Sequence, residues 1–393
     1  MYIEKDVIVL ARPDHSLAIY YNLLKRDSIN FLFCCFKVLP SWMRYVVKNS
    51  KAKFYTKNFS CCKLLTILNI YRVRYGKYHL EAKEPGLYEF HLSHTLPFYI
   101  PKLVHYWPMF SMRYVKRLKE KHPEIKTFAE VYFPCENWVL DNMKPLYKKM
   151  GVDVYTGKIE RDARKLKEVM EFEDNFLVPS KFVADTYREY YPNKNYIIIP
   201  YGIQKWAGYK KKNNISEKSE VRKFVFCGGG ISIEKGCDLM FDYFTNHPEL
   251  ELHVYGAFSP DQKTYFENRS YTSNIHLHGF VAKAKLQEEI SKYDVGIHFS
   301  RYDAYSLSVS EMTGAGLPVV VSDKTGNFFQ LQEIGAGLVT KLEIEDIENK
   351  IEHIREPQIY NKMLDNIDQY LERNVPTYGE QIIEFYKQQL NER

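Results

Sequence analysis

The sequence predicts an α/β protein with two doubly wound domains, residues 1–203 and 204–375, that face each other across a cleft. Its 393 residues exceed the ~250–300 at which a single hydrophobic core stops growing. Short apolar runs alternate with helix-like segments in both halves, which is typical of parallel sheets. A polar, unpatterned stretch at 206–223 separates the two series and indicates a linker or surface loop.

In the first half, the run 6–11 (DVIVLA) predicts a buried strand that enters a helix through Arg12-Pro13-Asp14-His15. Further strands are expected at 30–36, 87–94, 127–133, 175–179 and 196–200. An amphipathic helix is expected at 158–171, and Ser180 is expected to cap the next one.

The second half repeats this alternation. Strands are expected at 224–227, 250–255, 274–278, 295–299 and 319–322. Helices are expected from about Gly236, from Lys283 and around Glu311, and helices fill the remainder. The final amphipathic helix, within 376–393, is expected to pack back on the first domain. Two such halves create a crevice between the carboxyl ends of two sheets, where ligands bind.

Composition limits the function classes. The chain is 45% hydrophobic and 26% charged, as in ordinary globular proteins. Its net charge of +6 is mild and spread out, so we expect no nucleic-acid partner. Seven Cys without a C-x-x-C pair argue against a disulfide framework or a structural zinc site and favour a cytoplasmic location. The start lacks an apolar signal region, so we expect neither secretion nor a membrane-anchoring helix.

The stretch 303–322 (DAYSLSVSEMTGAGLPVVVS) carries the most chemical information. Asp303 sits in a loop after a predicted strand, and Tyr305 to Leu307 lead into a helix whose free backbone N–H groups attract phosphate. The Glu311 carboxylate can accept two hydroxyls, as on a ribose. Spacing alone leaves open a plain strand–helix–strand unit with solvated carboxylates.

This stretch resembles the E-x7-E signature of the group 1 glycosyltransferases, family 4. These are retaining enzymes with the GT-B fold, in which two Rossmann-like domains face each other. The usual form is E-G-F-G-L-x-x-x-E-A-M-A-x-G-x-P-V-V. Asp303 stands at the first Glu and Ser306 replaces the second Gly, whereas Glu311, Gly316 and the run 318–320 match.

Other segments resemble the family in the expected order. They are 224–236 (FVFCGGGISIEKG), 176–184 (FLVPSKFVA), 199–203 (IPYGI) and 274–281 (NIHLHGFV). The resemblance is good over 175–340 and faint before it.

The resemblance implies roles by position. Lys235 binds the donor diphosphate, Glu311 holds the ribose, and Asp303 contacts the donor sugar. The remaining donor-binding residues that it implies are Gly228, Gly229, Gly230, Phe280, Val281, Tyr305, Ser306 and Leu307. The family's Arg falls at Gly230, so one phosphate cation is missing; Arg301 and Lys324 are the candidate substitutes.

The first domain departs from the family. The loop 12–15 lacks the Gly-rich pattern, and 126–138, at the place of the family's His segment, holds Glu130 and Glu136 but no His. The nearby histidines are His91, His94 and His105. Of these, His94 is predicted, with Glu130, as a cleft residue near the reacting centre, beside Asp303 and Lys235. The alternative for His94 is a purely structural role.

The resemblance implies a retaining hexosyl- or pentosyltransferase. It would move a sugar from a nucleoside-diphosphate donor to a hydroxyl of a glycan or a lipid-linked acceptor. No D-x-D motif with a suitable loop is visible, so we expect no metal and no other cofactor. Basic aromatic stretches at 37–45 and 106–117 fit peripheral contact with the inner face of a membrane, or buried helix faces. The alternatives are a non-catalytic partner subunit of the same fold and a sugar-nucleotide epimerase.

Overall fold

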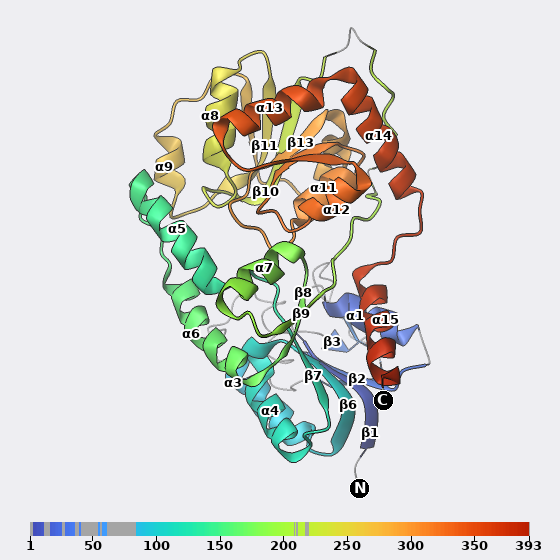
Figure 1. Ribbon diagram of the computed structural model, residues 1–393. Helices are drawn as coiled ribbons and strands as arrows, with labels where there is room; N and C mark the ends of the chain where they lie inside the picture. Colours follow the sequence, from blue (N-terminus) through green and yellow to red (C-terminus); the bar gives the residue numbers. More distant parts are fainter. Residues whose placement is uncertain are drawn as a thin grey trace.

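The computed structural model describes residues 3–11, 16–25, 28–35, 39–40, 54–55, 57–60, 84–207, 209, 211–216 and 220–392. They form two lobes, each a sheet with helices on its faces (Figure 1). The loop at 12–15, most of the basic stretch at 37–45, Cys61 and Cys62 lie outside the described residues.

The first lobe is built on a parallel sheet with strand order β5-β2-β1-β6-β7-β8-β9 among the described residues. Its strands are β1 (Ile3–Leu10), β2 (Phe31–Cys34), β5 (Phe59–Ser60), β6 (Tyr99–Tyr106), β7 (Lys126–Glu130), β8 (Asn175–Val178) and β9 (Asn195–Ile198). A separate short pair joins β3 (Leu39–Pro40) and β4 (Phe54–Tyr55). The helices are α1 (Ser16–Leu24), α3 (Glu84–Thr95), α4 (Pro108–Lys121), α5 (Glu136–Met150), α6 (Gly157–Phe172) and α7 (Lys181–Tyr190).

The second lobe has a parallel sheet with strand order β12-β11-β10-β13-β14-β15. Its strands are β10 (Lys223–Ile231), β11 (Glu251–Phe258), β12 (Ile275–Gly279), β13 (Val295–His298), β14 (Val319–Ser322) and β15 (Gly337–Thr340). The helices are α8 (Cys237–Asn246), α9 (Lys263–Glu267), α10 (Lys283–Glu289), the 3₁₀ turn η3 (Ile290–Lys292), α11 (Leu307–Gly314), α12 (Phe328–Ile334), α13 (Ile344–Arg355) and α14 (Pro357–Leu371). The central strands β13 and β14 are wholly buried, as expected of strands covered on both faces.

The last helix, α15 (Tyr378–Asn391), returns to the first lobe, where it packs on α1 and β6 (Figure 1). Its buried Ile382, Ile383 and Tyr386 join a core cluster that includes Val7 and Val9 of β1. Chain segments far apart in the sequence therefore share one core in the first lobe.

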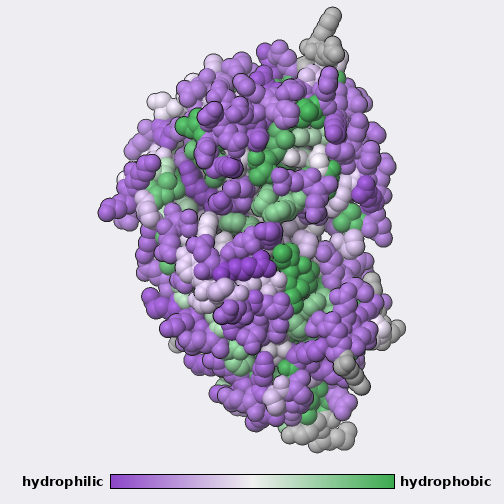
Figure 2. Space-filling view, viewed as in Figure 1, coloured by the Kyte–Doolittle hydropathy of each residue, from purple (hydrophilic) through white to green (hydrophobic). Residues whose placement is uncertain are grey.

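Hydrophilic side chains cover most of the face shown in Figure 2, and hydrophobic ones gather near its middle, where the lobes meet. Among the described residues, no helix combines the length and the apolar character that a bilayer crossing requires.

The predicted α/β class with two parallel sheets is confirmed, but some elements differ. The strand predicted at 87–94 is wrong, because these residues lie in α3. Tyr88 and Leu92, four positions apart, are both fully buried, which is the spacing of one helix face. Five of the described strands were missed. Three of them, β3, β4 and β5, have only two residues each. β6 contains Pro101 and Lys102, which interrupt its apolar pattern, and β15 has only four residues.

Gly236 allows the segment before α8 to pack closely against the residues just after β13. It precedes α8 with φ of 67°, and a Cβ there would lie 1.9 Å from the carbonyl oxygen of Phe299, just after β13. Only glycine satisfies both the backbone conformation and this contact.

Gly236→Ala should therefore destabilise the protein far more than Gly151→Ala. Gly151, after α5, has the same φ of 67°, but a Cβ added there would meet nothing within 4 Å. The left-handed backbone costs alanine about 1–2 kcal/mol at both sites. Overpacking should add at least about 2 kcal/mol at position 236. Urea unfolding measures both losses, and equal losses would show that the close approach is not a constraint.

Candidate functional site

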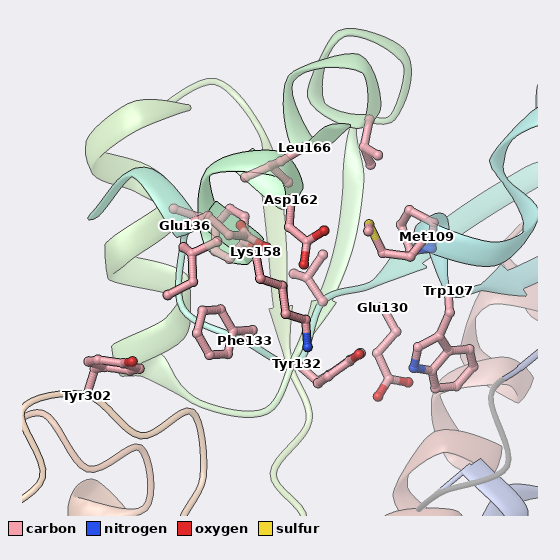
Figure 3. Close-up of a pocket in the computed structure, with 15 residues that line it drawn as sticks. Trp107, Met109, Glu130, Tyr132, Phe133, Glu136, Lys158, Asp162, Leu166 and Tyr302 are labelled. Atoms are coloured by element: carbon pink, nitrogen blue, oxygen red, sulfur yellow. The ribbon is translucent and has the colours of Figure 1, made fainter. Parts of the chain in front are cut away.

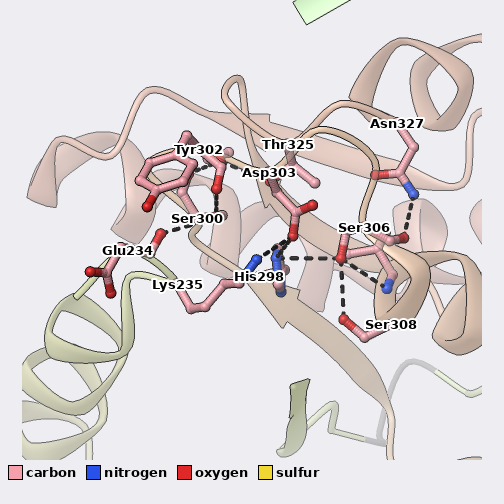
Figure 4. A network of polar contacts seen from close by, with 12 residues as sticks. Glu234, Lys235, His298, Ser300, Tyr302, Asp303, Ser306, Ser308, Thr325 and Asn327 are labelled. Carbon is pink, nitrogen blue, oxygen red and sulfur yellow. Dashed lines mark hydrogen bonds and ion pairs between the residues drawn. The ribbon is translucent and has the colours of Figure 1, made fainter. Parts of the chain in front are cut away.

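One carboxylate lies at the centre of a polar cluster in the second lobe (Figure 4). Asp303 Oδ2 lies 2.6 Å from Lys235 Nζ and 3.1 Å from His298 Nε2. Lys235 comes from the turn between β10 and α8, and His298 is the last residue of β13. Three segments thus meet at one side chain.

The backbone of Asp303 is fixed from both sides. Its N–H donates to the carbonyl of Lys324 (2.9 Å), and its carbonyl accepts from the N–H of Gly326 (2.8 Å). Both partners lie in the turn after β14, so the loop after β13 is tied to the neighbouring strand. These two hydrogen bonds fix the backbone of Asp303, although the residue lies in a loop and not in a helix or strand.

The electrostatics favour an ionised Asp303. Burial would raise its pKa, but the Lys235 ammonium and the hydrogen bond from His298 outweigh burial and hold the pKa well below its usual range. Burial lowers the pKa of His298, whose ring stacks on Phe226, so this imidazole is neutral and donates from Nε2.

The start of α11 lies beside this cluster. Ser306 is its N-cap residue, and the Ser306 hydroxyl accepts from the N–H of Val309. The Asn327 side chain donates to the Ser306 carbonyl (3.0 Å) and to Ser310 Oγ (3.1 Å), which holds the cap in place. The remaining free N–H groups of this first turn give the site a local positive potential.

These elements enclose a pocket of about 380 Å³, which we call the donor pocket. Of the residues that the sequence assigned to the donor, it is lined by Gly228, Gly229, Lys235, Phe280, Val281, Asp303, Ser306, Leu307 and Glu311. The structure therefore brings together residues spread over more than 80 positions of the chain.

Two assigned residues do not line this pocket. A Cβ on Gly230 would meet Ser259 Oγ instead. The Tyr305 side chain is buried: its hydroxyl donates to Gln330 Oε1, and its ring contacts that of Tyr201. Tyr305 thus anchors the loop before α11 through contacts with Gln330 and Tyr201, outside the donor pocket.

The suggested replacement cations also lie elsewhere. The Arg301 guanidinium makes two hydrogen bonds to the buried Asp238 carboxylate, at 2.7 and 2.8 Å, and Lys324 pairs with Asp323. Neither residue lines the donor pocket, so the structure gives no support to the suggestion that they substitute for the missing Arg. Arg301 instead joins the loop after β13 to α8.

His298 and Lys283 also line the donor pocket, and sequence reasoning assigned neither of them to it. Lys283 Nζ lies 2.8 Å from Glu311 Oε1 and 5.1 Å from the Trp206 ring centroid. Lys283 is 70% exposed, so its pairing with Glu311 is weak and leaves that carboxylate able to accept from a ligand. The sequence signal that could have identified His298 as a site residue is its position at the end of the apolar strand VGIH.

A second pocket, of about 410 Å³, lies in the first lobe next to the lobe junction (Figure 3), and we call it the acceptor-side pocket. Aromatic and charged side chains share its wall. They are Trp107, Tyr132, Phe133, Tyr187, Tyr302, Glu130, Glu136, Lys158 and Asp162. Tyr302 belongs to the second lobe but lines this first-lobe pocket. The next residue, Asp303, lines the donor pocket, so each pocket has one of two consecutive residues in its wall.

Glu130 lies in this pocket at the end of β7 and is only 3% exposed. Its Oε2 accepts from the Tyr378 hydroxyl (2.6 Å) and lies 2.9 Å from His105 Nε2. His105 Nδ1 in turn lies 2.7 Å from the Tyr386 hydroxyl. The returning helix α15 thus helps to position the carboxylate.

His94 is placed differently from its predicted cleft position. It is exposed near the end of α3, its Nδ1 contacts the carbonyl of Phe90 (2.7 Å), and it lines neither pocket. The histidine that contacts Glu130 is His105, which lies near the end of β6, the strand that sequence reasoning missed.

Charge in the acceptor-side pocket is mainly acidic. Glu130, Glu136 and Asp162 face one lysine, Lys158. Burial, together with the nearby Asp162 carboxylate, raises the pKa of Glu136 to about 7. Carboxylates next to aromatic faces suit a hydroxyl-rich ligand better than an anionic one.

Comparison with known proteins relates this arrangement to sugar-transferring enzymes. Residues 209–372 match the family Glycosyl transferases group 1. A curated protein of Escherichia coli K12, the putative colanic acid biosynthesis glycosyl transferase WcaC, is 24% identical over 274 residues. That alignment covers 64% of this chain and 62% of WcaC, so it spans less than two thirds of that relative.

Solved structures share the fold over the whole chain. Sucrose-phosphate synthase of Thermosynechococcus elongatus has a TM-score of 0.65 at 14% identity, covering 98% of this chain and 99% of that one. Anabaena HepE in complex with UDP and glucose has a TM-score of 0.57 at 12% identity, covering 98% and 99%. At such identities the likeness concerns the fold.

Asp303→Asn should reduce stability in a pH-dependent way. The pKa of Asp303 is lower in the folded than in the unfolded chain, so its stabilising contribution is present above about pH 4–5 and is lost as pH falls through the folded value. Removing the charge should cost about 3 kcal/mol at pH 7.

Urea unfolding of both proteins at pH 7 and at pH 3 measures this effect, and the difference between them should shrink at the lower pH. Asp323→Asn is the matched control, because its pair with Lys324 is about one third exposed and should matter little. A difference that does not change with pH would contradict the assignment of an ionised, stabilising Asp303.

Proposed function

We propose that this chain, which contains a Glycosyl transferases group 1 domain and has the GT-B fold, transfers a sugar from a nucleoside-diphosphate donor to a glycan hydroxyl. The observation that carries the proposal is the donor pocket. There Asp303, Lys235 and Glu311 line one cavity with the N-terminus of α11. The match over residues 209–372 covers all of these residues.

The donor is proposed to lie along this pocket with its diphosphate at the centre. The Lys235 ammonium and the free N–H groups at the start of α11 offer positive charge there. Gly228 and Gly229 have no side chains, so a phosphate or ribose can approach the backbone closely. These groups would stabilise the charge that builds on the leaving nucleoside diphosphate.

The nucleoside is proposed to bind at the other end. Glu311 would accept hydrogen bonds from the ribose hydroxyls in place of its exposed contact with Lys283. Phe280 lines the same pocket, is 80% exposed and offers a ring face for the base. A ligand base that covers this exposed ring would remove apolar surface from water, which favours binding.

The donor sugar would then lie near Asp303, at the side facing the first lobe. The short carboxylate, held by Lys235 and His298, would accept sugar hydroxyls and orient the anomeric carbon. We propose retention of anomeric configuration, as the family resemblance implies. We also propose that no metal ion is needed, because Lys235, Lys283 and the α11 N-terminus supply positive charge to the pocket.

The acceptor is proposed to be a sugar hydroxyl bound in the acceptor-side pocket. Aromatic faces pack on the C–H faces of sugars, and carboxylates accept their hydroxyls. With three carboxyl groups facing Lys158, a neutral or amino sugar fits this wall better than a phosphate group. The next residue after Tyr302 is Asp303, so an acceptor there would face the donor sugar.

Lys235→Met should lower kcat at least ~100-fold, because it removes a cation at the leaving group. Glu311→Ala should instead weaken donor binding about 10- to 100-fold, the loss of a charge-assisted hydrogen bond. UDP-, GDP-, ADP- and TDP-sugars, screened by thermal shift and then by turnover, identify the donor for these assays. Lys324→Ala is the control, since Lys324 lies outside the pocket and pairs with Asp323.

If both variants keep full activity, the donor-site assignment is wrong. A chain that binds no sugar nucleotide and turns none over would be a partner subunit. Conversion of the donor to an isomeric sugar nucleotide without acceptor would indicate an epimerase.

Asp162→Asn and Tyr132→Ala should raise KM for the acceptor about 10-fold or more while leaving KM for the donor unchanged, since both line only the acceptor-side pocket. Steady-state kinetics with each substrate varied in turn measures this split. Glu168→Gln, on the exposed face of the same helix as Asp162, is the matched control. Equal effects on both KM values would place the acceptor elsewhere.

A further inference from the structure

Four side chains with metal-binding atoms share one face at the edge of the second sheet. Glu251 and His253 lie on β11, and His276 and His278 lie on β12, the edge strand. The parallel register sets His253 opposite His276. Side chains two positions apart on a strand point to the same face, so Glu251 and His278 join them.

The ligand atoms of this cluster are close together. One atom each from Glu251, His253 and His276 lies within 4.8 Å of the others. His253 Nε2 is 3.2 Å from Glu251 Oε2, and His253 Nδ1 is 3.0 Å from His278 Nε2. Two ligand atoms on a tetrahedral zinc ion, each ~2.0–2.1 Å from it, lie about 3.3 Å apart. The 3.2 Å between His253 Nε2 and Glu251 Oε2 is therefore near the spacing of a coordinated pair.

Ring stacking brings the imidazoles of the cluster together. The His253 ring lies 4.5 Å from that of His276 and 5.3 Å from that of His278, measured between centroids. Where two ring nitrogens face each other at 3.0 Å, one must act as acceptor for the other's proton.

The side chains have room to adjust around an ion. Glu251 is 41% exposed and His253 15% exposed, and His278 is exposed as well. An ion can thus reach the cluster from solvent, and small rotations of the rings can direct their nitrogens toward it. Imidazole with one carboxylate is a ligand set that suits Zn²⁺.

We propose that Glu251, His253 and His276 bind one Zn²⁺ ion, with solvent completing its coordination. This site is separate from the donor diphosphate, so it assigns no metal to sugar transfer. It stands whether or not the proposed transferase activity is correct.

The ion would restrict the motion of the end of β12, which leads into the wall of the donor pocket. The His278 ring stacks on Tyr255, with centroids 4.5 Å apart and planes 13° apart. Tyr255 lines the donor pocket, and β12 ends one residue before Phe280. Zinc binding at the cluster should therefore stiffen the wall next to the base.

Titration of Zn²⁺ into the chelator-treated 393-residue chain, followed by calorimetry, tests the site. We expect one ion per chain in the wild type. His253→Ala and His276→Ala should each weaken binding at least 10-fold, and Glu251→Gln should weaken it less. His353→Ala is the control, because His353 lies on α13 and pairs with Glu356.

Absorption of bound Co²⁺ provides a second readout, since its visible bands report the ligand geometry that silent Zn²⁺ cannot show. The wild-type spectrum should be lost in the double variant His253→Ala/His276→Ala, while the metal-free melting temperature of that variant shows that it is folded. A wild type that binds no zinc, or a folded double variant that binds as tightly as the wild type, would overturn the proposal.

Discussion

The contact between Asp303 and Lys235 is the interaction on which the donor pocket depends. It joins the turn after β10 to the loop after β13, and His298 adds a third strand-end contact. This approach requires a residue without a side chain at Gly236, where any Cβ would meet the backbone just after β13. This ion pair thereby sets the distance between the turn after β10 and the loop after β13, both of which line the donor pocket.

The same loop relates the two pockets. Tyr302 and Asp303 are neighbours in the chain, yet one faces the first lobe and the other faces the donor pocket. Ser180, at the cap of α7, donates to the Ala304 carbonyl across the lobe junction (2.7 Å). The loop that contains Asp303, the proposed sugar contact, is therefore also a loop through which the two lobes touch. A change in the relative position of the lobes would for this reason also change the geometry of the site.

Local patterns allowed most of the second lobe to be predicted. The stretch 303–322 contains a loop, a cap, a helix and the next strand in order, and β14 has the bounds expected. Lys283 was missed because its proximity to Glu311 arises from the order of strands in the sheet, which sequence spacing does not reveal. The zinc-site cluster likewise depends on the register of β11 against β12.

The first lobe was harder to predict, because its strands carry polar and proline residues. Because β6 was not predicted, nothing in the sequence favoured His105 over His94, which was expected at the end of a strand but lies on α3. A crystal structure of the chain with an intact nucleoside-diphosphate sugar tests the central claim most directly. We expect the ribose at Glu311, the diphosphate between Lys235 and the start of α11, and the sugar at Asp303. A ligand bound outside this pocket, or an Asp303 still paired only with Lys235 and His298, would contradict the assignment.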